Sequence, residues 1–254
     1  MTRLAVFNSK GGVAKTTSVL NLAAAATRDQ RPALMIDLDP QAHLTRTWAE
    51  PPRDMAETLF ALFQDSKGLA GLEKPWSGLG SIVPAHGQLI KVDTIFGKGP
   101  AILNRLRHAL DSLEATRGAR PTLLDCCPYT GVLSLNALFA ADALLVPVAT
   151  DYLSLNAAYQ ITAALSALEP VMKRRLPRRY VLTRFDRRRK MSADVRERLT
   201  ERFAGEVCTT VISENVSVAE SPARGRDVFS HNAVSAGAAD YLALYEELKA
   251  AGML

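Results

Sequence analysis

The chain has 254 residues, of which 48% are hydrophobic, so it can bury a substantial core as one large domain or two small ones. It contains no run of about 18 apolar residues, so a membrane-spanning helix is not expected. The net charge of +5 is a mild indication of a polyanionic partner. An N-terminus that leads straight into a strand pattern argues against a cleaved signal peptide, and three cysteines without a C-x-x-C pair favour reduced thiols and a cytoplasmic protein.

A glycine-containing loop joins the first predicted strand, residues 4–7, to the first predicted helix. The loop reads Lys10-Gly11-Gly12-Val13-Ala14-Lys15-Thr16-Thr17. In loops of this type, backbone N–H groups and the helix N-terminus bind phosphates, a lysine meets the outer phosphates and a hydroxyl binds Mg²⁺. The general pattern G-x-x-x-x-G-K-[ST] would place glycines at positions 9 and 14, where this chain has Ser9 and Ala14. The loop is therefore irregular, with a glycine pair and an additional lysine, Lys10.

Carboxylates follow two further apolar strands. Residues 32–36 lead to Asp37 and Asp39, and residues 121–124 lead to Asp125. Ligands bind at the carboxyl ends of parallel strands, so the neighbouring phosphate loop favours a functional role over helix capping for these acids. An acid at the end of an apolar strand is also the pattern of a residue that holds Mg²⁺ through water. We interpret Cys126 and Cys127 as small buried residues beside the site, because adjacent cysteines lack metal-ligand spacing.

The remaining segments alternate between strand and helix patterns. Helices are predicted at 55–64, 101–113, 133–140, from about 154 into a basic segment, at 192–203 and at 236–250. Further strands are predicted at 81–84, 143–148, 180–183 and 207–212. This alternation predicts an α/β fold with a mostly parallel twisted central sheet, flanked by helices on both faces, in a single domain over residues 1–254.

The positive charge is concentrated in one segment. Residues 173–190 contain ten basic residues and one acid, so the segment carries +9 and the rest of the chain −4. Its densest part is Arg187-Arg188-Arg189-Lys190, which we call the basic turn. A charge run of this kind is most often a solvated loop, and its alternative role is contact with nucleic-acid phosphates.

Taken together, these motifs resemble the ParA/MinD family of ATPases, which have a deviant Walker loop. The resemblance rests on the loop 10–17, Asp37-Leu-Asp39-Pro-Gln, Leu-Leu-Asp125, and Val146-Pro-Val followed by Asp151-Tyr152. In addition, residues 211–222 are similar to that family's IPRNVRLAEAP stretch. The resemblance covers nearly the whole chain and is closest to small ParA-type proteins without an N-terminal operator-binding domain.

The resemblance implies roles for the loop residues. Residues 10–17 would bind ATP, Lys15 would contact the β- and γ-phosphates, and Thr16 would ligate Mg²⁺. Lys10 matches the signature lysine that reaches the partner's nucleotide across a dimer. The family therefore implies a homodimer that forms with ATP and encloses two nucleotides.

The resemblance also assigns residues outside the loop. Asp39 matches the residue that positions the attacking water, while Asp37 and Asp125 would support Mg²⁺. Thr183 and Arg184 lie where the family contacts the nucleotide base. Phosphoryl transfer to water depends mainly on this positioning and on charge stabilisation.

Three departures from the family pattern affect these expectations. Ala14 replaces the usual glycine, and if that position needs a positive φ, alanine costs about 1 kcal/mol or more there, which predicts slow hydrolysis with nucleotide binding retained. Cys127 stands where the family often has proline. Glu214 and Ser217 stand where it has arginines that help bind DNA.

The basic turn still favours nonspecific DNA as a partner, through phosphate contacts rather than base contacts. A nucleoid-associated ATPase that positions a plasmid, a chromosome or a protein cargo, stimulated by a ParB-like protein or cargo adaptor, is the function that the resemblance implies. The cargo itself is not identified by any residue.

Three alternatives were considered. A MinD-like membrane ATPase would need a basic amphipathic tail, but the C-terminus carries Asp240, Glu246 and Glu247 against Lys249 alone. An iron–sulfur carrier would need a different cysteine spacing. A scaffold that dimerises on ATP with little hydrolysis and no DNA role stays open, because Asp39 favours hydrolysis while Ala14 predicts that hydrolysis is slow.

Overall fold

The computed structural model describes residues 2–96 and 99–254. Its centre is an eight-stranded sheet in the order β3-β4-β2-β5-β1-β6-β7-β8, in which only the β3–β4 pair is antiparallel. The strands are β1 (Arg3–Val6), β2 (Ala33–Asp37), β3 (Lys74–Trp76), β4 (Gly80–Val83), β5 (Thr122–Asp125), β6 (Ala143–Ala149), β7 (Arg178–Phe185) and β8 (Val207–Ser213). The predicted mostly parallel α/β sheet is therefore confirmed.

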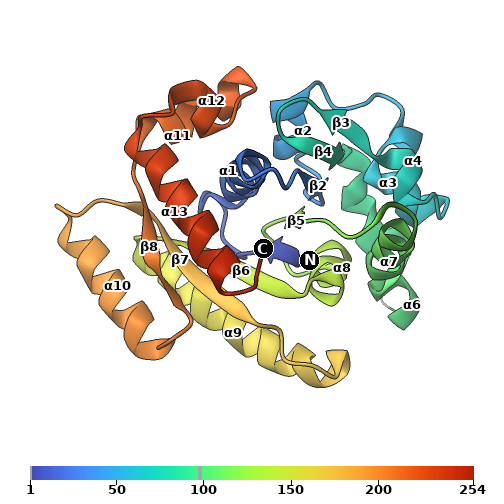
Figure 1. Ribbon diagram of the computed structural model, residues 1–254. Coiled ribbons are helices and arrows are strands. Elements are labelled where there is room, and N and C mark those ends of the chain that lie inside the picture. Colours follow the sequence, from blue (N-terminus) through green and yellow to red (C-terminus); the bar gives the residue numbers. More distant parts are fainter. Residues whose placement is uncertain (1, 97–98) are drawn as a thin grey trace.

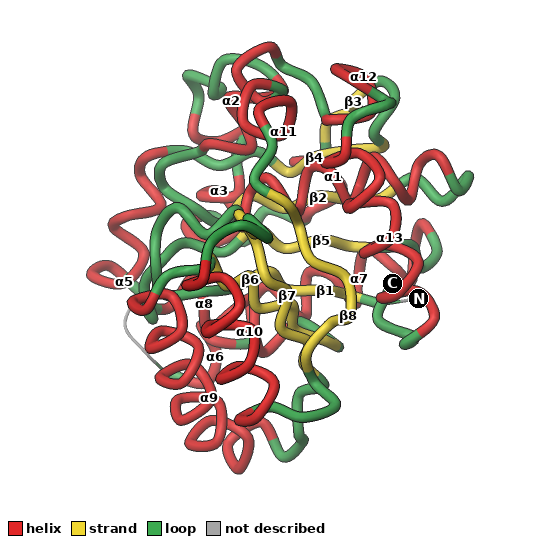
Figure 2. The backbone as a smooth tube through the Cα atoms, turned by 90° about the vertical axis from the view of Figure 1, so that its left-hand side faces the viewer, coloured by secondary structure: helices red, strands yellow, loops and turns green. Residues whose placement is uncertain are grey.

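Helices cover both faces of the sheet, as Figures 1 and 2 show. One face carries α1 (Lys15–Arg28), α12 (Val228–Asn232) and α13 (Ala236–Ala250). The opposite face carries α3 (Leu59–Gln64), α7 (Arg105–Arg117), α8 (Val132–Ala140), α9 (Tyr152–Met172) and α10 (Lys190–Arg202). The central strands β1, β2, β5 and β6 are buried along their full length, which explains why they read as continuous apolar runs in the sequence.

Shorter elements surround this core. They are α2 (His43–Trp48), α4 (Leu69–Leu72), α5 (Val92–Ile95), α6 (Pro100–Leu103), α11 (Val216–Glu220) and the 3₁₀ turns Met55–Glu57, Gly87–Lys91 and Pro222–Arg224. The two ends of the chain lie side by side (Figures 1 and 2), where the Thr2 hydroxyl donates to the Gly252 carbonyl at 3.3 Å. Among the residues that the structure describes, every helix is too short or too polar to cross a bilayer.

The boundaries of three predicted helices differ from the observed ones. The predicted helix 55–64 is interrupted at Thr58, whose side chain caps α3 by accepting a hydrogen bond from the Phe60 amide. The predicted helix 101–113 is divided at Asn104 into α6 and α7. Helix α10 begins at Lys190 rather than at Ser192, so the last residue of the basic turn is helical.

The register of the central strands places the predicted site residues together. Val6, the last residue of β1, pairs with Asp125 in β5, and Asp125 pairs on its other side with Asp37 in β2. Because parallel strands share their direction, the loop after β1 and the acids that end β2 and β5 lie at one edge of the sheet.

Candidate functional site

The loop after β1 has two residues in the left-handed backbone region. Gly12 has φ 74°, and Ala14, which caps α1, has φ 68° and ψ 32°. A residue with a Cβ costs about 1–2 kcal/mol in this region. The sequence-based concern about Ala14 therefore applies: the position does need a positive φ, and this chain fills it with alanine. A Cβ built on Gly11 or Gly12 would meet no atom within 4 Å, so the backbone there faces open space that phosphate oxygens can approach.

Contacts to β6 and β7 hold the loop in place. The buried Asn8 side chain donates to the Pro147 carbonyl at 2.8 Å and accepts from the Lys10 amide at 2.9 Å. The Thr183 hydroxyl, fully buried in β7, donates to the Val13 carbonyl at 3.2 Å. Asn8 was not among the predicted site residues, since its partner lies 139 positions away in the chain.

The two loop lysines have different environments. The Lys15 ammonium is buried and donates to the Lys10 carbonyl at 2.8 Å, and burial lowers the pKa of this amine. The Lys10 ammonium lies 2.5 Å from Asp151 Oδ1 and 3.1 Å from the Ser154 hydroxyl. Although partial burial acts in the opposite direction, the hydrogen bonds that Asp151 accepts from Lys10 and from Ser154 lower its pKa.

The acids at the ends of β2 and β5 are buried beside this loop. Asp125 is 1% exposed, and neither of its carboxylate oxygens has a hydrogen-bond partner among the described residues. Burial, followed by the charge of Asp37, raises the pKa of Asp125, and the nearby Thr16 hydroxyl partly offsets this rise. A buried carboxylate without a partner, beside a hydroxyl and a phosphate-type loop, fits a divalent cation.

Asp37 is engaged differently from Asp125. Its Oδ1 accepts from the Asp39 amide at 3.0 Å, and its Oδ2 accepts from the Thr45 amide at 2.9 Å and the Thr45 hydroxyl at 2.7 Å. The Thr45 hydroxyl in turn accepts from the Ala85 amide at 2.9 Å. Burial raises the pKa of Asp37. Its carboxylate therefore fastens the segment that carries Asp39, and the metal role predicted for Asp37 stays a prediction.

The loop after β1 and Asp39 border a cavity of about 810 Å³. Its lining includes the loop residues 11–12 and 14–17 and Asp39, which is 7% exposed and accepts from the Gln41 amide at 2.8 Å. Arg184 and Glu214 lie on the lining, as do residues of α11 and the following 3₁₀ turn. The two predicted base contacts, Thr183 and Arg184, thus both line the cavity, and the Thr183 hydroxyl also donates to the loop.

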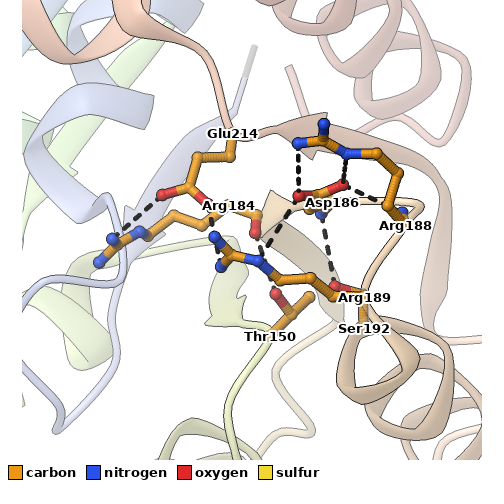
Figure 3. Close-up of polar contacts among 7 residues, drawn as sticks. All are labelled: Thr150, Arg184, Asp186, Arg188, Arg189, Ser192 and Glu214. Atoms are coloured by element: carbon orange, nitrogen blue, oxygen red, sulfur yellow. Dashed lines mark hydrogen bonds and ion pairs between the residues drawn. The ribbon is translucent and has the colours of Figure 1, made fainter.

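The basic turn lies just beyond β7 and is tied to two acids (Figure 3). Asp186 accepts from Arg188 at 3.0 Å and lies 3.5 Å from Arg189 Nε. Glu214, at the end of β8, lies 3.3 Å from Arg184 Nη2 and 3.2 Å from Arg189 Nη1. The hydrogen bond from Arg188 lowers the pKa of Asp186 to about 2, so this acid is ionised throughout the neutral range. The four basic residues are thus close together, but two of them already have carboxylate partners.

The cysteines beside the site are buried, as predicted. Cys126 and Cys127 are fully buried, and burial raises the pKa of both thiols. Cys127 Sγ lies 3.1 Å from the Ser134 hydroxyl at the start of α8. Among the described residues, three or more His, Cys, Asp or Glu side chains nowhere gather in a group that could hold a metal ion.

Comparisons with known proteins agree with this arrangement. A family model described as an AAA domain matches residues 1–177. The chromosome partitioning protein ParA of Caulobacter vibrioides is 32% identical over 248 residues, covering 96% of this chain and 92% of that protein. The chromosome-partitioning ATPase Soj of Thermus thermophilus is 34% identical over 249 residues, covering 98% and 95%.

A solved structure extends the similarity to three dimensions. The structure described as cobyrinic acid a,c-diamide synthase from Mycobacterium smegmatis, with bound ATP analogue and magnesium, has a TM-score of 0.84 and 26% sequence identity to this chain. The match covers 98% of this chain and 95% of that one.

Proposed function

The chain belongs to the ParA/MinD family of P-loop ATPases, and from this membership we propose that it is an ATP-dependent switch that binds DNA and positions a cargo. The chain is a ParA-type ATPase. The proposal adds four properties: a sandwich homodimer with ATP, slow hydrolysis stimulated by a partner, nonspecific DNA binding, and transport or positioning of a plasmid, chromosome or protein cargo in the cytoplasm at the nucleoid.

The observation that carries the proposal is the meeting of Lys15, Asp39 and Asp125 at the ends of β1, β2 and β5. Lys15 would hold the outer phosphates of ATP, and the loop amides would surround them. Thr16 and Asp125 would hold Mg²⁺, and Asp37 would support the site. Mg²⁺, when bound, would neutralise charge on the phosphate oxygens.

Asp39 is proposed to orient the attacking water. Its Oδ1 already accepts from the Gln41 amide, and the Asp39 amide is held by Asp37, so the carboxylate is fixed by its own segment. Orientation of this kind supplies much of what phosphoryl transfer to water requires. Ala14, with its strained backbone, supports a slow turnover.

Lys10 is proposed to complete the site of a second subunit. Its side chain is 30% exposed and is held by Asp151 and Ser154 at the N-terminus of α9. The interaction is partly solvent-exposed and therefore weak enough to exchange for a phosphate of the partner's nucleotide. Dimerisation with ATP would then require Lys10 to leave Asp151.

The basic turn is proposed to contact the DNA backbone. Arg188 and Arg189 side chains are 90% and 61% exposed despite their ion pairs, so phosphates can reach them. Phosphate contacts of this kind bind DNA without regard to sequence and weaken steeply with salt.

Dimerisation with ATP is tested by measuring the molar mass of the protein in solution. We expect ATP with Mg²⁺, but not ADP, to convert monomer to dimer, as measured by light scattering coupled to size-exclusion chromatography. Asp39→Ala should dimerise and retain ATP, whereas Lys10→Ala should remain monomeric. Lys67→Ala, at an exposed lysine that donates to the Ala56 carbonyl, is the matched control. A Lys10→Ala variant that dimerises normally would contradict the sandwich.

DNA binding is tested by measuring how the affinity for duplex DNA depends on salt concentration. Replacing Arg187 and Lys190 by alanine should weaken binding to duplex DNA and lower the slope of log K against log salt by about 2. Replacing the exposed Arg53 and Arg107 removes the same charge elsewhere and serves as the control. If the protein dimerises with ATP but hydrolyses little of it and fails to bind duplex DNA at low salt, the scaffold alternative is favoured.

A further inference from the structure

Two arginines from different parts of the chain converge on one carboxylate. Arg184 lies within β7 and lines the nucleotide cavity, and Arg189 is in the basic turn. Both guanidinium groups reach Glu214, Arg184 at Oε1 and Arg189 at Oε2 (Figure 3). Arginine pairs positioned in this way are a recurrent means of binding oxyanions, phosphate included.

The main chain that carries these two arginines and Glu214 is held by hydrogen bonds. The Thr150 hydroxyl donates to the Arg184 carbonyl at 2.9 Å, where Arg184 has a φ of 53°. The Glu214 amide donates to the Phe185 carbonyl at 3.1 Å, and the Arg189 amide donates to the Asp186 carbonyl at 3.0 Å. The main chain of Arg184, Arg189 and Glu214 is therefore held independently of the ion pairs between their side chains.

The Glu214 carboxylate can be displaced from the two arginines. Its side chain is 39% exposed, and those of Arg184 and Arg189 are about 60% exposed. Ion pairs exposed to this degree contribute little to stability, so an external anion can displace the carboxylate at small cost. Asp186 differs, because its side chain is 13% exposed and also accepts from the Arg188 amide within the turn.

We propose that Arg184 and Arg189 form a binding position for a DNA phosphodiester, which Glu214 occupies in the free protein as an internal substitute. This inference rests on the proposed function, since it presupposes that the basic turn contacts DNA. The position extends the DNA surface from the basic turn to the edge of the nucleotide cavity. It also makes Glu214 a competitor that weakens DNA binding until a phosphate replaces it.

The competitor is removed by Glu214→Gln, which keeps the size of the side chain and deletes its charge. The matched control is Glu197→Gln, on the exposed side of α10, where the carboxylate forms no ion pair with any described residue. Each variant is titrated with a duplex of arbitrary sequence from about 50 to about 300 mM KCl, with ATP and Mg²⁺ and without nucleotide. Affinity for a fluorescent ATP analogue is measured in parallel.

We expect Glu214→Gln to bind DNA about 3- to 10-fold more tightly than wild type near 100 mM KCl, with a salt slope steeper by about 1, the value for one additional phosphate contact. Glu197→Gln should change DNA affinity by less than about twofold, since a distant exposed charge is screened. Affinity for the ATP analogue should stay the same in both variants.

Four results would overturn the inference. Equal effects of the two substitutions would mean that only net charge matters. Tighter binding of the ATP analogue by Glu214→Gln, without tighter DNA binding, would assign the arginine pair to the nucleotide. If neither wild type nor Glu214→Gln binds DNA at low salt, the DNA role in the proposed function is wrong, and the inference is wrong with it. If wild type binds DNA and Glu214→Gln binds it equally well, only the inference is wrong.

Discussion

Lys10 Nζ lies 2.5 Å from Asp151 Oδ1 of the same chain. The pair connects the phosphate loop after β1 to the first residue before α9, where Asp151 also accepts from the Ser154 amide at 2.9 Å. The lysine that we propose to act across a dimer is thus engaged within its own subunit. Any contact between Lys10 and a second nucleotide competes with this ion pair.

Removing the charge of Asp151 should therefore favour dimerisation. Asp151→Asn keeps an oxygen for the Ser154 amide, because asparagine caps helices as well as aspartate does. We expect ATP-dependent dimers at protein concentrations about 3- to 10-fold lower than in wild type, as sedimentation velocity would measure, which corresponds to about 1 kcal/mol for a partly exposed pair. Asp227→Asn changes the aspartate that caps α12 and is the control. An unchanged dimerisation midpoint would mean that the contact with Asp151 does not restrain Lys10.

Ala14 is expected to slow turnover through its left-handed backbone. Ala14→Gly removes strain of about 1–2 kcal/mol at φ 68° but increases the freedom of the unfolded chain, so the net gain in folding stability should be within about 1 kcal/mol. We expect the rate of phosphate release to rise by several-fold, while the affinity for ATP changes little. Gln30→Gly, at an exposed turn with φ 57°, should relieve comparable backbone strain without changing the rate. A wild-type rate in Ala14→Gly would refute the idea that Ala14 restrains the loop.

The loop and the strands around it were predictable from sequence because each depends on local signals. The run after β1 combines glycines, lysines and hydroxyls at characteristic spacing, and β2 and β5 are short apolar runs that end in acids. What the pattern could not supply was the strand order. The direct pairing of Asp37 with Asp125 follows from β2 and β5 being neighbours, although 84 residues separate β2 from β5 in the chain.

Contacts between distant segments explain what the sequence missed. Asn8 is read from sequence as one more polar loop residue, and only its bond to the Pro147 carbonyl shows that it anchors the loop. Glu214 was recognised as a reversed charge, but its pairing with Arg184 and Arg189 depends on how β8 lies against β7, where the register is irregular. The helix break at Asn104 is likewise absent from the apolar pattern, which continues through it.

Thr45 is expected to position Asp39 through Asp37. Thr45→Val keeps the shape of the side chain but removes the hydroxyl from both Asp37 Oδ2 and the Ala85 amide. Leaving buried polar groups without partners should destabilise the fold by about 1–3 kcal/mol. Because the segment with Asp39 loosens, kcat should fall more than the affinity for ATP. Thr116→Val, which removes only bonds to the Ser112 and Leu113 carbonyls within α7, should change neither kcat nor ATP affinity appreciably. Equal losses of kcat in the two variants would remove the positioning role.

Asp37 and Asp125 should make the stability of the metal-free protein depend on pH. Both carboxyl groups have a raised pKa in the folded state, first because they are buried. The charge of Asp37 adds to the rise in the pKa of Asp125, and the charge of Asp39 adds to the rise in the pKa of Asp37. Between the ordinary carboxyl pKa of about 4 and the higher folded values, the folded state binds more protons than the unfolded state. The stabilising effect of these protons is therefore complete at low pH and is lost as the pH rises toward neutrality.

Asp125→Asn isolates this contribution, since it removes one of the two charges. Without Mg²⁺ and nucleotide, we expect the variant to have a higher Tm than wild type near pH 7.5, with the difference shrinking near pH 5. Asp186→Asn is the control of opposite sign: its carboxyl pKa is lowered to about 2, so that its stabilising effect is present at neutral pH and is lost only in strong acid. Mg²⁺ with ATP should raise the Tm of wild type more than that of Asp125→Asn, because the cation would replace the missing partner of this carboxylate. A Tm difference that is independent of pH would mean that the pKa of Asp125 is not raised in the folded state. Equal stabilisation of both proteins by Mg²⁺ with ATP would mean that Asp125 does not support the cation.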